Sequence, residues 1–153
     1  MLDKTDRDIL RILQQNAKLT TKELASSVNL SSTPVFERQK RLENEGYIRK
    51  YVAVADPEKL GLGILVFCNV RLSQHTRTNG CDFVEAINGM EEVVECYNTS
   101  GEYDFMLKVY AKDMKDYQNF LMTKLGAIEC IGALHSVFVM DETKNSHSVP
   151  VVE

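Results

Sequence analysis

The chain has 153 residues, of which 44% are hydrophobic and 26% charged, and a formal net charge of −4. These values are ordinary for one globular domain or two small ones, and they argue against a disordered chain and against a nucleic-acid binder that is basic throughout. The charge is divided unevenly, because residues 1–60 hold 11 Lys+Arg against 9 Asp+Glu, whereas residues 61–153 hold 7 against 13. Contacts with a polyanion are therefore expected in the first part, and a different task in the acidic second part.

The sequence lacks the signals that mark several classes of protein and several kinds of site. The start, MLDKTDRDIL, has acidic residues and no apolar core of a signal peptide, and no run approaches the ~18 apolar residues of a membrane span, so a cytoplasmic protein is expected. The four cysteines form no CxxC pair and are expected to be ordinary free thiols, with redox sensing by one of them as a second option. The three histidines lack metal spacing, and neither a catalytic triad nor a glycine-rich phosphate loop is visible. We expect no metal, no cofactor and no enzymatic activity.

The first 54 residues predict a three-helix unit whose last two helices form a helix-turn-helix. Residues 3–15 have an apolar face at helical spacing, with Asp3 as the candidate N-cap. Thr20 and Glu23 fit a capping box at the start of the second helix, over residues 21–27. Asn29 suits the tight turn that follows. The expected core consists of apolar side chains from all three helices and the turn: Ile9, Leu13, Leu24, Val28, Leu30, Val35 and Leu42.

The third helix, from Ser32 to about Glu45, combines an apolar seam with three cations. Ser31 and Ser32 offer side-chain oxygens for the first amides, and Gly46 is a natural stop. Residues 47–54 have the composition of a short wing strand. The organisation predicted is a winged helix-turn-helix domain over 1–54, a hinge over 55–63, and a second domain over 64–153.

The second domain predicts a ferredoxin-like βαββαβ sandwich, so the fold class is α+β. Strands are expected over 64–72, 93–98, 103–111 and 131–140, and helices over 81–88 and from Asp113 to Gly126. Two helices cover only one face of a four-stranded sheet. Because the strand over 64–72 is apolar on both parities, its second face is predicted to pack against another copy of the chain, as a homodimer.

Specific runs of residues carry a family resemblance along nearly the whole chain. They are Leu2-Asp3-x-x-Asp6-x-x-Ile9-Leu10, Leu30-Ser31, Val35-x-x-Arg38-x-x-Arg41-Leu42-Glu43-x-x-Gly46 with Ile48, Gly101 to Met106, and the tail from Thr143 to Pro150. These runs resemble the Lrp/AsnC family of bacterial and archaeal transcriptional regulators. The resemblance implies a DNA-binding helix-turn-helix and a C-terminal domain that dimerises, assembles further (often to octamers) and binds small effectors, commonly amino acids, between dimers.

The resemblance also points to site residues. Candidates for contact with double-stranded DNA at pseudo-palindromic sites lie on the third helix and beside it: Lys22, Ser32, Thr33, Phe36, Glu37, Arg38, Lys40, Arg41 and Arg49. Among them, Arg38 and Arg41 are expected to contact the DNA backbone or to bridge to acidic groups inside the unit. The implied effector pocket comprises Thr99, Ser100, Gly101, Glu102, Tyr103 and Asp104, with Ser136 as a weaker match. Asp104 is the candidate acceptor for an α-ammonium group, although Gly-x-x-Asp between strands is also an ordinary hairpin turn.

Two alternatives remain open from the sequence. Some tetrapyrrole-processing decarboxylases resemble this family in both halves, but they would be expected to gather histidine and arginine side chains in the acidic half. That half holds only Arg71, Arg77 and the three histidines. The other alternative is a non-specific architectural DNA-binding protein, which the small positive charge of the first part disfavours.

Overall fold

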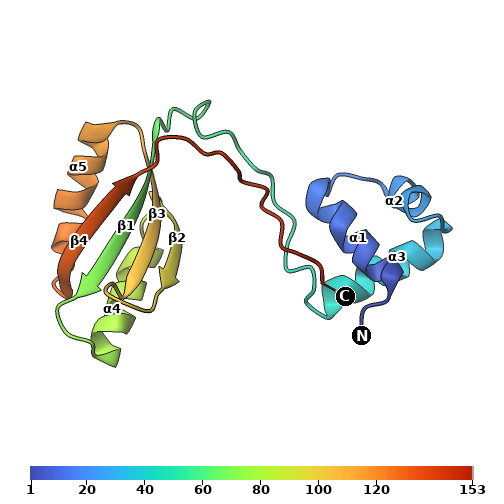
Figure 1. Cartoon of the computed structure of the whole chain (residues 1–153), viewed down its shortest axis with the longest axis horizontal. Helices are drawn as coiled ribbons and strands as arrows, with labels where there is room; N and C mark the ends of the chain where they lie inside the picture. Colours follow the sequence, from blue (N-terminus) through green and yellow to red (C-terminus); the bar gives the residue numbers. More distant parts are fainter. Residues whose placement is uncertain (153) are drawn as a thin grey trace. The chain divides into compact units, whose positions relative to one another are not determined.

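The computed structural model of the chain describes residues 1–152, which form two compact units (Figure 1). Unit 1 comprises the first 54 residues together with the end of the chain from Lys144, and unit 2 comprises Ala55–Thr143. Unit 1 includes the tail from Lys144, whereas the predicted C-terminal domain ran over residues 64–153. None of the helices described is long and apolar enough to cross a membrane.

Unit 1 contains three helices, the first two of which start at side-chain capping boxes. They are α1 (Lys4–Gln15), α2 (Thr21–Ser27) and α3 (Ser32–Asn44). Asp3 and Asp6 form a reciprocal capping box at α1, and Thr20 and Glu23 form another at α2. Each box satisfies amides that a helix start leaves unpaired, so the short helices begin at defined residues. By contrast, Ser31 occupies the N-cap of α3 without a side-chain hydrogen bond.

The core of unit 1 is small and lies between the three helices. Its buried residues are Ile9, Leu10, Leu13, Leu24, Ala25, Val35 and Leu42, with Val151 of the tail among the half-buried side chains packed against them. Leu30, expected in this core, is 40% exposed because it follows the left-handed turn at Asn29 (φ 55°) rather than facing inward. Gly46 ends the α3 region with φ +78°, as expected for a helix stop.

The wing strand predicted for residues 47–54 is absent from the chain as described, where this segment belongs to no sheet. A strand needs a hydrogen-bonded partner, and none of the described residues of the same chain supplies one. Its composition is nevertheless that of a strand, and Tyr51, Val52 and Val54 remain exposed.

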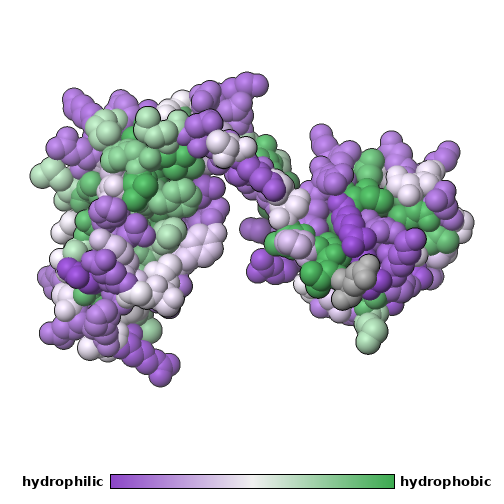
Figure 2. Space-filling view, viewed as in Figure 1, coloured by the Kyte–Doolittle hydropathy of each residue, from purple (hydrophilic) through white to green (hydrophobic). Residues whose placement is uncertain are grey.

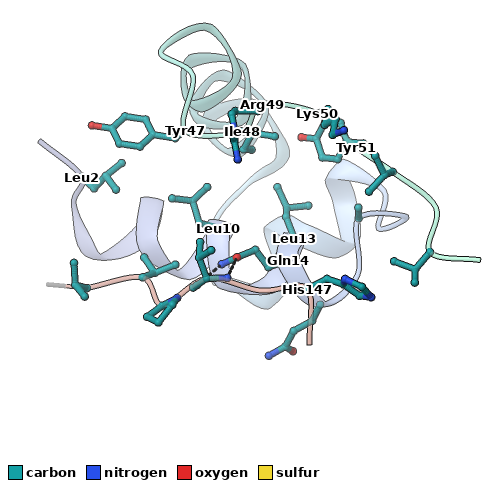
Figure 3. Close-up of a pocket in the computed structure, with 18 residues that line it drawn as sticks. Leu2, Leu10, Leu13, Gln14, Tyr47, Ile48, Arg49, Lys50, Tyr51 and His147 are labelled. Carbon is teal, nitrogen blue, oxygen red and sulfur yellow. Dashed lines mark hydrogen bonds between the residues drawn. The ribbon is translucent and has the colours of Figure 1, made fainter. Parts of the chain in front are cut away.

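The tail packs beside α1. Gln14 bonds the backbone of Val149 in both directions, as donor to its carbonyl (3.2 Å) and acceptor from its amide (2.7 Å), and Arg11 donates to the carbonyl of Val151 (3.0 Å). Gln14 lines a hollow of about 620 Å³ within unit 1, and Figure 3 shows Leu10 and Leu13 projecting into it from α1. The end of the chain is thus a structural part of the helical unit.

Unit 2 has the predicted βαββαβ order and the strand order β2-β3-β1-β4, all antiparallel. Its strands are β1 (Ile64–Leu72), β2 (Val93–Asn98), β3 (Phe105–Ala111) and β4 (Ile131–Phe138). Its helices are α4 (Arg77–Asn88), α5 (Met114–Thr123) and the short turn η1 (Leu125–Ala127). Helix α4 begins four residues earlier than expected because Thr76 caps it through the amide of Asn79.

Both helices of unit 2 cover the same face of the sheet. Phe83 of α4 and Tyr117 and Phe120 of α5 pack against alternate strand residues such as Val66 and Leu107, which are fully buried. The opposite face is uncovered. We call it the open face, and its residues are Leu65, Phe67, Asn69 and Arg71 of β1, Glu95 and Tyr97 of β2, Met106, Lys108 and Tyr110 of β3, and Ala133, His135 and Val137 of β4.

The open face mixes apolar and polar side chains. Tyr97 and Val137 are 50% and 44% exposed, and Leu65 and Phe67 are half-buried. Hydrophobic side chains are also visible among hydrophilic ones on the surface of each unit in Figure 2. An apolar row in the middle of a sheet face without a covering layer is typical of a surface that associates.

Candidate nucleic-acid interface and effector pocket

Helix α3 presents one exposed row of side chains. Val35 and Leu42 are fully buried and hold the helix against α1 and α2, so the residues on the opposite side must face solvent. The exposed candidates on this side are Ser32, Thr33, Phe36, Glu37 and Lys40. Lys22 at the start of α2 and Arg49 beyond α3 are exposed as well.

Lys40 and Phe36 lie together at the centre of this row. The Lys40 ammonium is 5.9 Å from the centre of the Phe36 ring and 2.8 Å from a carboxylate oxygen of Glu43. The hydrogen bond to Glu43 raises the pKa of Lys40, which keeps the side chain cationic at neutral pH. Such exposed ion pairs are weak, so Lys40 can leave Glu43 for a stronger anionic partner. Phe36 is 50% exposed, which is high for a large aromatic side chain.

Arg38 and Arg41 are engaged inside unit 1, which was one of the two roles expected for them. Arg38 donates to Asp3 (2.5 Å) and to Asp6 (2.7 Å), and Arg41 donates to the other oxygen of Asp6 (2.5 Å). Asp6 is the one buried charged residue among those described, at 1% exposure. The sequence identified Asp3 and Asp6 as capping residues but not as partners of α3. Their separation of 32 to 35 residues from the arginines leaves no local signal.

Most of the expected effector residues lie in the turn between β2 and β3. The other two, Asp104 and Ser136, do not line the hollow beside that turn. Between β2 and β3 the turn is closed by Thr99, whose amide donates to the Asp104 carbonyl (2.9 Å) and whose hydroxyl donates to the Tyr103 carbonyl (2.8 Å). Gly101 has φ +115°, a conformation that favours glycine. An open hollow of about 500 Å³ beside the turn is lined by Asn69, Asn98, Thr99, Ser100, Glu102, Tyr103 and Met106.

The carboxylate of Asp104 is already used by the fold. One oxygen accepts from the Leu72 amide (2.8 Å) and the other contacts Nδ1 of His75 (2.7 Å). These bonds, above all that from the Leu72 amide, lower the pKa of Asp104. Asp104 thereby ties the start of β3 to the end of β1, and it is not among the residues that line the hollow. Its carboxylate thus bonds residues far from it in the sequence, and not the turn between β2 and β3.

Ser136 also lies apart from the hollow. It is the register partner of Cys68 on β1 and faces the helices, where its hydroxyl is 2.6 Å from that of Tyr117. Burial raises the pKa of Tyr117, so the phenol stays protonated. Asn69, Asn98 and Met106 are hollow residues that the sequence did not identify. The signal available was Asn69, a polar residue inside a mostly apolar strand.

The remaining titratable groups of the described residues form no candidate metal site. The described histidine, cysteine and acidic residues include no group that could hold a metal ion. All four cysteines are free, Cys68 being buried and Cys81 and Cys96 exposed. His135 stacks on Tyr103 at 5.9 Å between ring centres.

Comparisons with known proteins cover both units. Residues 2–49 match a family model described as winged helix-turn-helix DNA-binding, and residues 65–149 match one described as the Lrp/AsnC ligand binding domain. The chain is 38% identical to the DNA-binding transcriptional activator DecR of Escherichia coli, over 99% of each chain. It is 37% identical to the transcriptional regulator AzlB of Bacillus subtilis, over 100% of this chain and 98% of that protein.

A solved structure of a transcriptional regulator has a similar fold over nearly the whole chain. A transcriptional regulator from Neisseria meningitidis, in complex with L-Met, superposes with a TM-score of 0.95 at 35% identity and covers 98% of this chain and 97% of its own.

Proposed function

The chain belongs to the Lrp/AsnC family of DNA-binding transcriptional regulators, and from that premise we propose that it reads operator DNA through α3 and responds to an amino acid bound by unit 2. The relatives named above regulate transcription and are not enzymes, which favours this function over a decarboxylase or an architectural protein. The observation that carries the DNA-reading role is the exposed row on α3, whose side chains are free to reach base edges while its arginines are engaged elsewhere.

The exposed row suits the major groove. A recognition helix of a helix-turn-helix lies in that groove with its first residues against base edges, which here are Ser32, Thr33 and Phe36. Phe36 can contact a thymine methyl group, and Lys40 can donate to guanine oxygen and nitrogen acceptors. Lys22 and Arg49 are assigned to phosphates, which position the protein without reading sequence.

Two substitutions separate base reading from phosphate binding. Lys40→Ala should lower affinity for a selected site about tenfold or more while leaving affinity for random DNA nearly unchanged, because a specific base contact contributes about 1–3 kcal/mol. Arg49→Ala should weaken binding to all sequences alike and reduce the salt slope by about 0.9. Fluorescence anisotropy with both DNAs across KCl concentrations measures this. Lys59→Ala, an 84% exposed cation of unit 2, is the control. If Lys40→Ala and Arg49→Ala each weakened binding to the selected site and to random DNA equally, the division of roles would be wrong.

A homodimer is proposed to be the binding unit. The half-exposed apolar row on the open face supports association of unit 2, and the unpaired strand-like segment 47–54 supports pairing of unit 1 with a second copy. Two copies double the phosphate contacts and match pseudo-palindromic sites. Assembly of dimers to an octamer is the higher state we propose.

The hollow beside the β2–β3 turn is the proposed effector pocket. It offers an exposed carboxylate at Glu102 for an α-ammonium group, polar side chains at Asn69 and Asn98, and an aromatic wall at Tyr103. The turn around Gly101 can bring backbone amides to an α-carboxylate. The relative solved with L-Met supports an amino acid as the chemical class. Because the hollow is open on one side, a neighbouring dimer is proposed to close it.

Screening the twenty amino acids by differential scanning fluorimetry tests this proposal. A true effector at about 100 times its Kd should raise the melting temperature of unit 2 by about 10 °C, since binding to the folded state alone stabilises by about 2.7 kcal/mol. Glu102→Gln should weaken that ligand about tenfold by removing a charge-assisted hydrogen bond. Glu91→Gln, also exposed in unit 2, should not. If no amino acid shifts the melting temperature, the effector proposal fails.

A further inference from the structure

We propose that Asp3 and Asp6 are positioning residues that withhold Arg38 and Arg41 from the phosphates of DNA, and so make binding depend on sequence rather than on charge. This inference rests on the proposed role of α3 as the DNA-reading helix. It assigns a function in DNA selection to two acidic residues outside that helix.

The two carboxylates are built into one preorganised acceptor. Asp3 Oδ1 accepts from the Asp6 amide (2.8 Å), and Asp6 Oδ2 accepts from the Asp3 amide (3.1 Å), so the first turn of α1 fixes both side chains. The other two oxygens, Asp3 Oδ2 and Asp6 Oδ1, accept from Arg38, and Asp6 Oδ2 accepts from Arg41 as well as from the Asp3 amide. Arg38 lies 2.5 Å from Asp3 and 2.7 Å from Asp6, and Arg41 lies 2.5 Å from Asp6.

Burial makes this acceptor hard to exchange for a phosphate. Asp6 is 1% exposed, and leaving a buried carboxylate without a cation is strongly unfavourable. A phosphate would therefore have to compete with this carboxylate for the arginine donors that it holds. The hydrogen bonds from Arg38 to Asp3 and then to Asp6 raise the pKa of Arg38, and the Asp6 amide, followed by Arg38, lowers the pKa of Asp3.

The arginines could otherwise reach DNA. Their side chains are 30% and 45% exposed, so the guanidinium groups lie at the surface of the unit and not in its core. They share α3 with Lys40, an exposed cation that pairs with the half-buried carboxylate of Glu43. Since each neutralised phosphate adds about 0.9 to the salt slope, two freed arginines would add a large sequence-independent term to binding.

The pairing also orients α3. Positions 38 and 41 lie about one turn apart on the same side of the helix, and both are bound to the first turn of α1. A helix held at two points cannot roll about its axis without breaking a bond. The face carrying Phe36 and Lys40 is thereby kept outward.

The decisive variant is Asp3→Asn, which keeps an N-cap oxygen for the Asp6 amide but removes one of the two carboxylate charges that balance Arg38 and Arg41, so that Asp6 alone is shared by both arginines. Binding is measured by anisotropy to a random-sequence 30-bp duplex and to a site selected in vitro with the wild type, between ~50 and ~300 mM KCl. Affinity for random DNA should rise about three- to tenfold, with a salt slope steeper by about 0.9. Affinity for the selected site should rise less, so the specificity ratio falls.

Two matched variants isolate the cause. Asp8→Asn makes the same change of net charge on α1, but its partner is Arg11 on the same helix, so random DNA should gain at most a small fraction of that effect. In the double variant Asp3→Asn/Arg38→Gln, the gain for random DNA should disappear. Asp3→Ser, another N-cap, repeats the test if the asparagine variant melts early.

The outcomes separate this inference from the proposed function. A purely structural role for Asp3 would lower affinity for both DNAs, and a general charge effect would make Asp3→Asn and Asp8→Asn equal. Either result overturns the inference. If instead the wild type itself fails to prefer any selected site over random DNA, the proposed DNA-reading function of α3 is what fails.

Discussion

Replacing Phe67 by lysine is expected to convert the protein to monomers and to lower its affinity for DNA with two half-sites by about 100-fold or more. Phe67 lies on β1 in the middle of the open face, with Lys108 of β3 and Val137 of β4 as its register partners. A lysine there would have to be buried without an anion, and it would stand opposite Lys108 as a like charge. Loss of association removes the second recognition helix, and linked binding of two modules commonly contributes 10²–10⁴ in affinity.

Sedimentation velocity and anisotropy with one and two half-sites measure the two effects of Phe67→Lys. The monomeric variant should bind one half-site as the wild type does, because unit 1 is unchanged. Met122→Lys is the control, since Met122 is 72% exposed on α5 and lies on the helical layer. A dimeric Phe67→Lys variant would show that association does not require the open face.

The fold was predictable where local signals and alternation determine it. The capping pairs Asp3–Asp6 and Thr20–Glu23 fixed the starts of two helices, and the apolar patterns of unit 2 gave the βαββαβ order. Predictions failed where a contact joins distant residues. The docking of Val149 on Gln14 spans 135 positions and has no pattern in either segment. The strand predicted over 47–54 is absent for a related reason. Its composition is typical of a strand, but composition does not show whether a neighbouring strand is there to pair with it.

The candidate site was predictable only in part, for the same physical reason. The exposed residues of α3 follow from helical periodicity once Val35 and Leu42 are placed inside. The commitment of Asp104 to the Leu72 amide depends on how two strands end, which no spacing reveals. Ser136 faces the helices because its register with Cys68 puts it there, and register is set by the whole sheet.

Leu42→Ala is expected to unfold unit 1 while leaving unit 2 folded and associated. Leu42 is fully buried in a core of few side chains, and such a truncation costs about 3–5 kcal/mol through lost burial and the cavity left behind. A unit of this size has little stability to spare, so the loss should lower its melting temperature by about 15 °C or more. DNA binding at 37 °C should fall in proportion to the folded fraction.

Unit 2 should respond independently, because its core contains none of the residues that bury Leu42. Calorimetry of the Leu42→Ala variant should show one transition moved down and a second unchanged, with the oligomeric state retained on sedimentation. Leu107→Ala makes the same truncation at a fully buried position of β3 and should move the other transition. If a single transition moved in both variants, the two units would unfold together, and the DNA-reading unit would take its stability from the domain that assembles the protein.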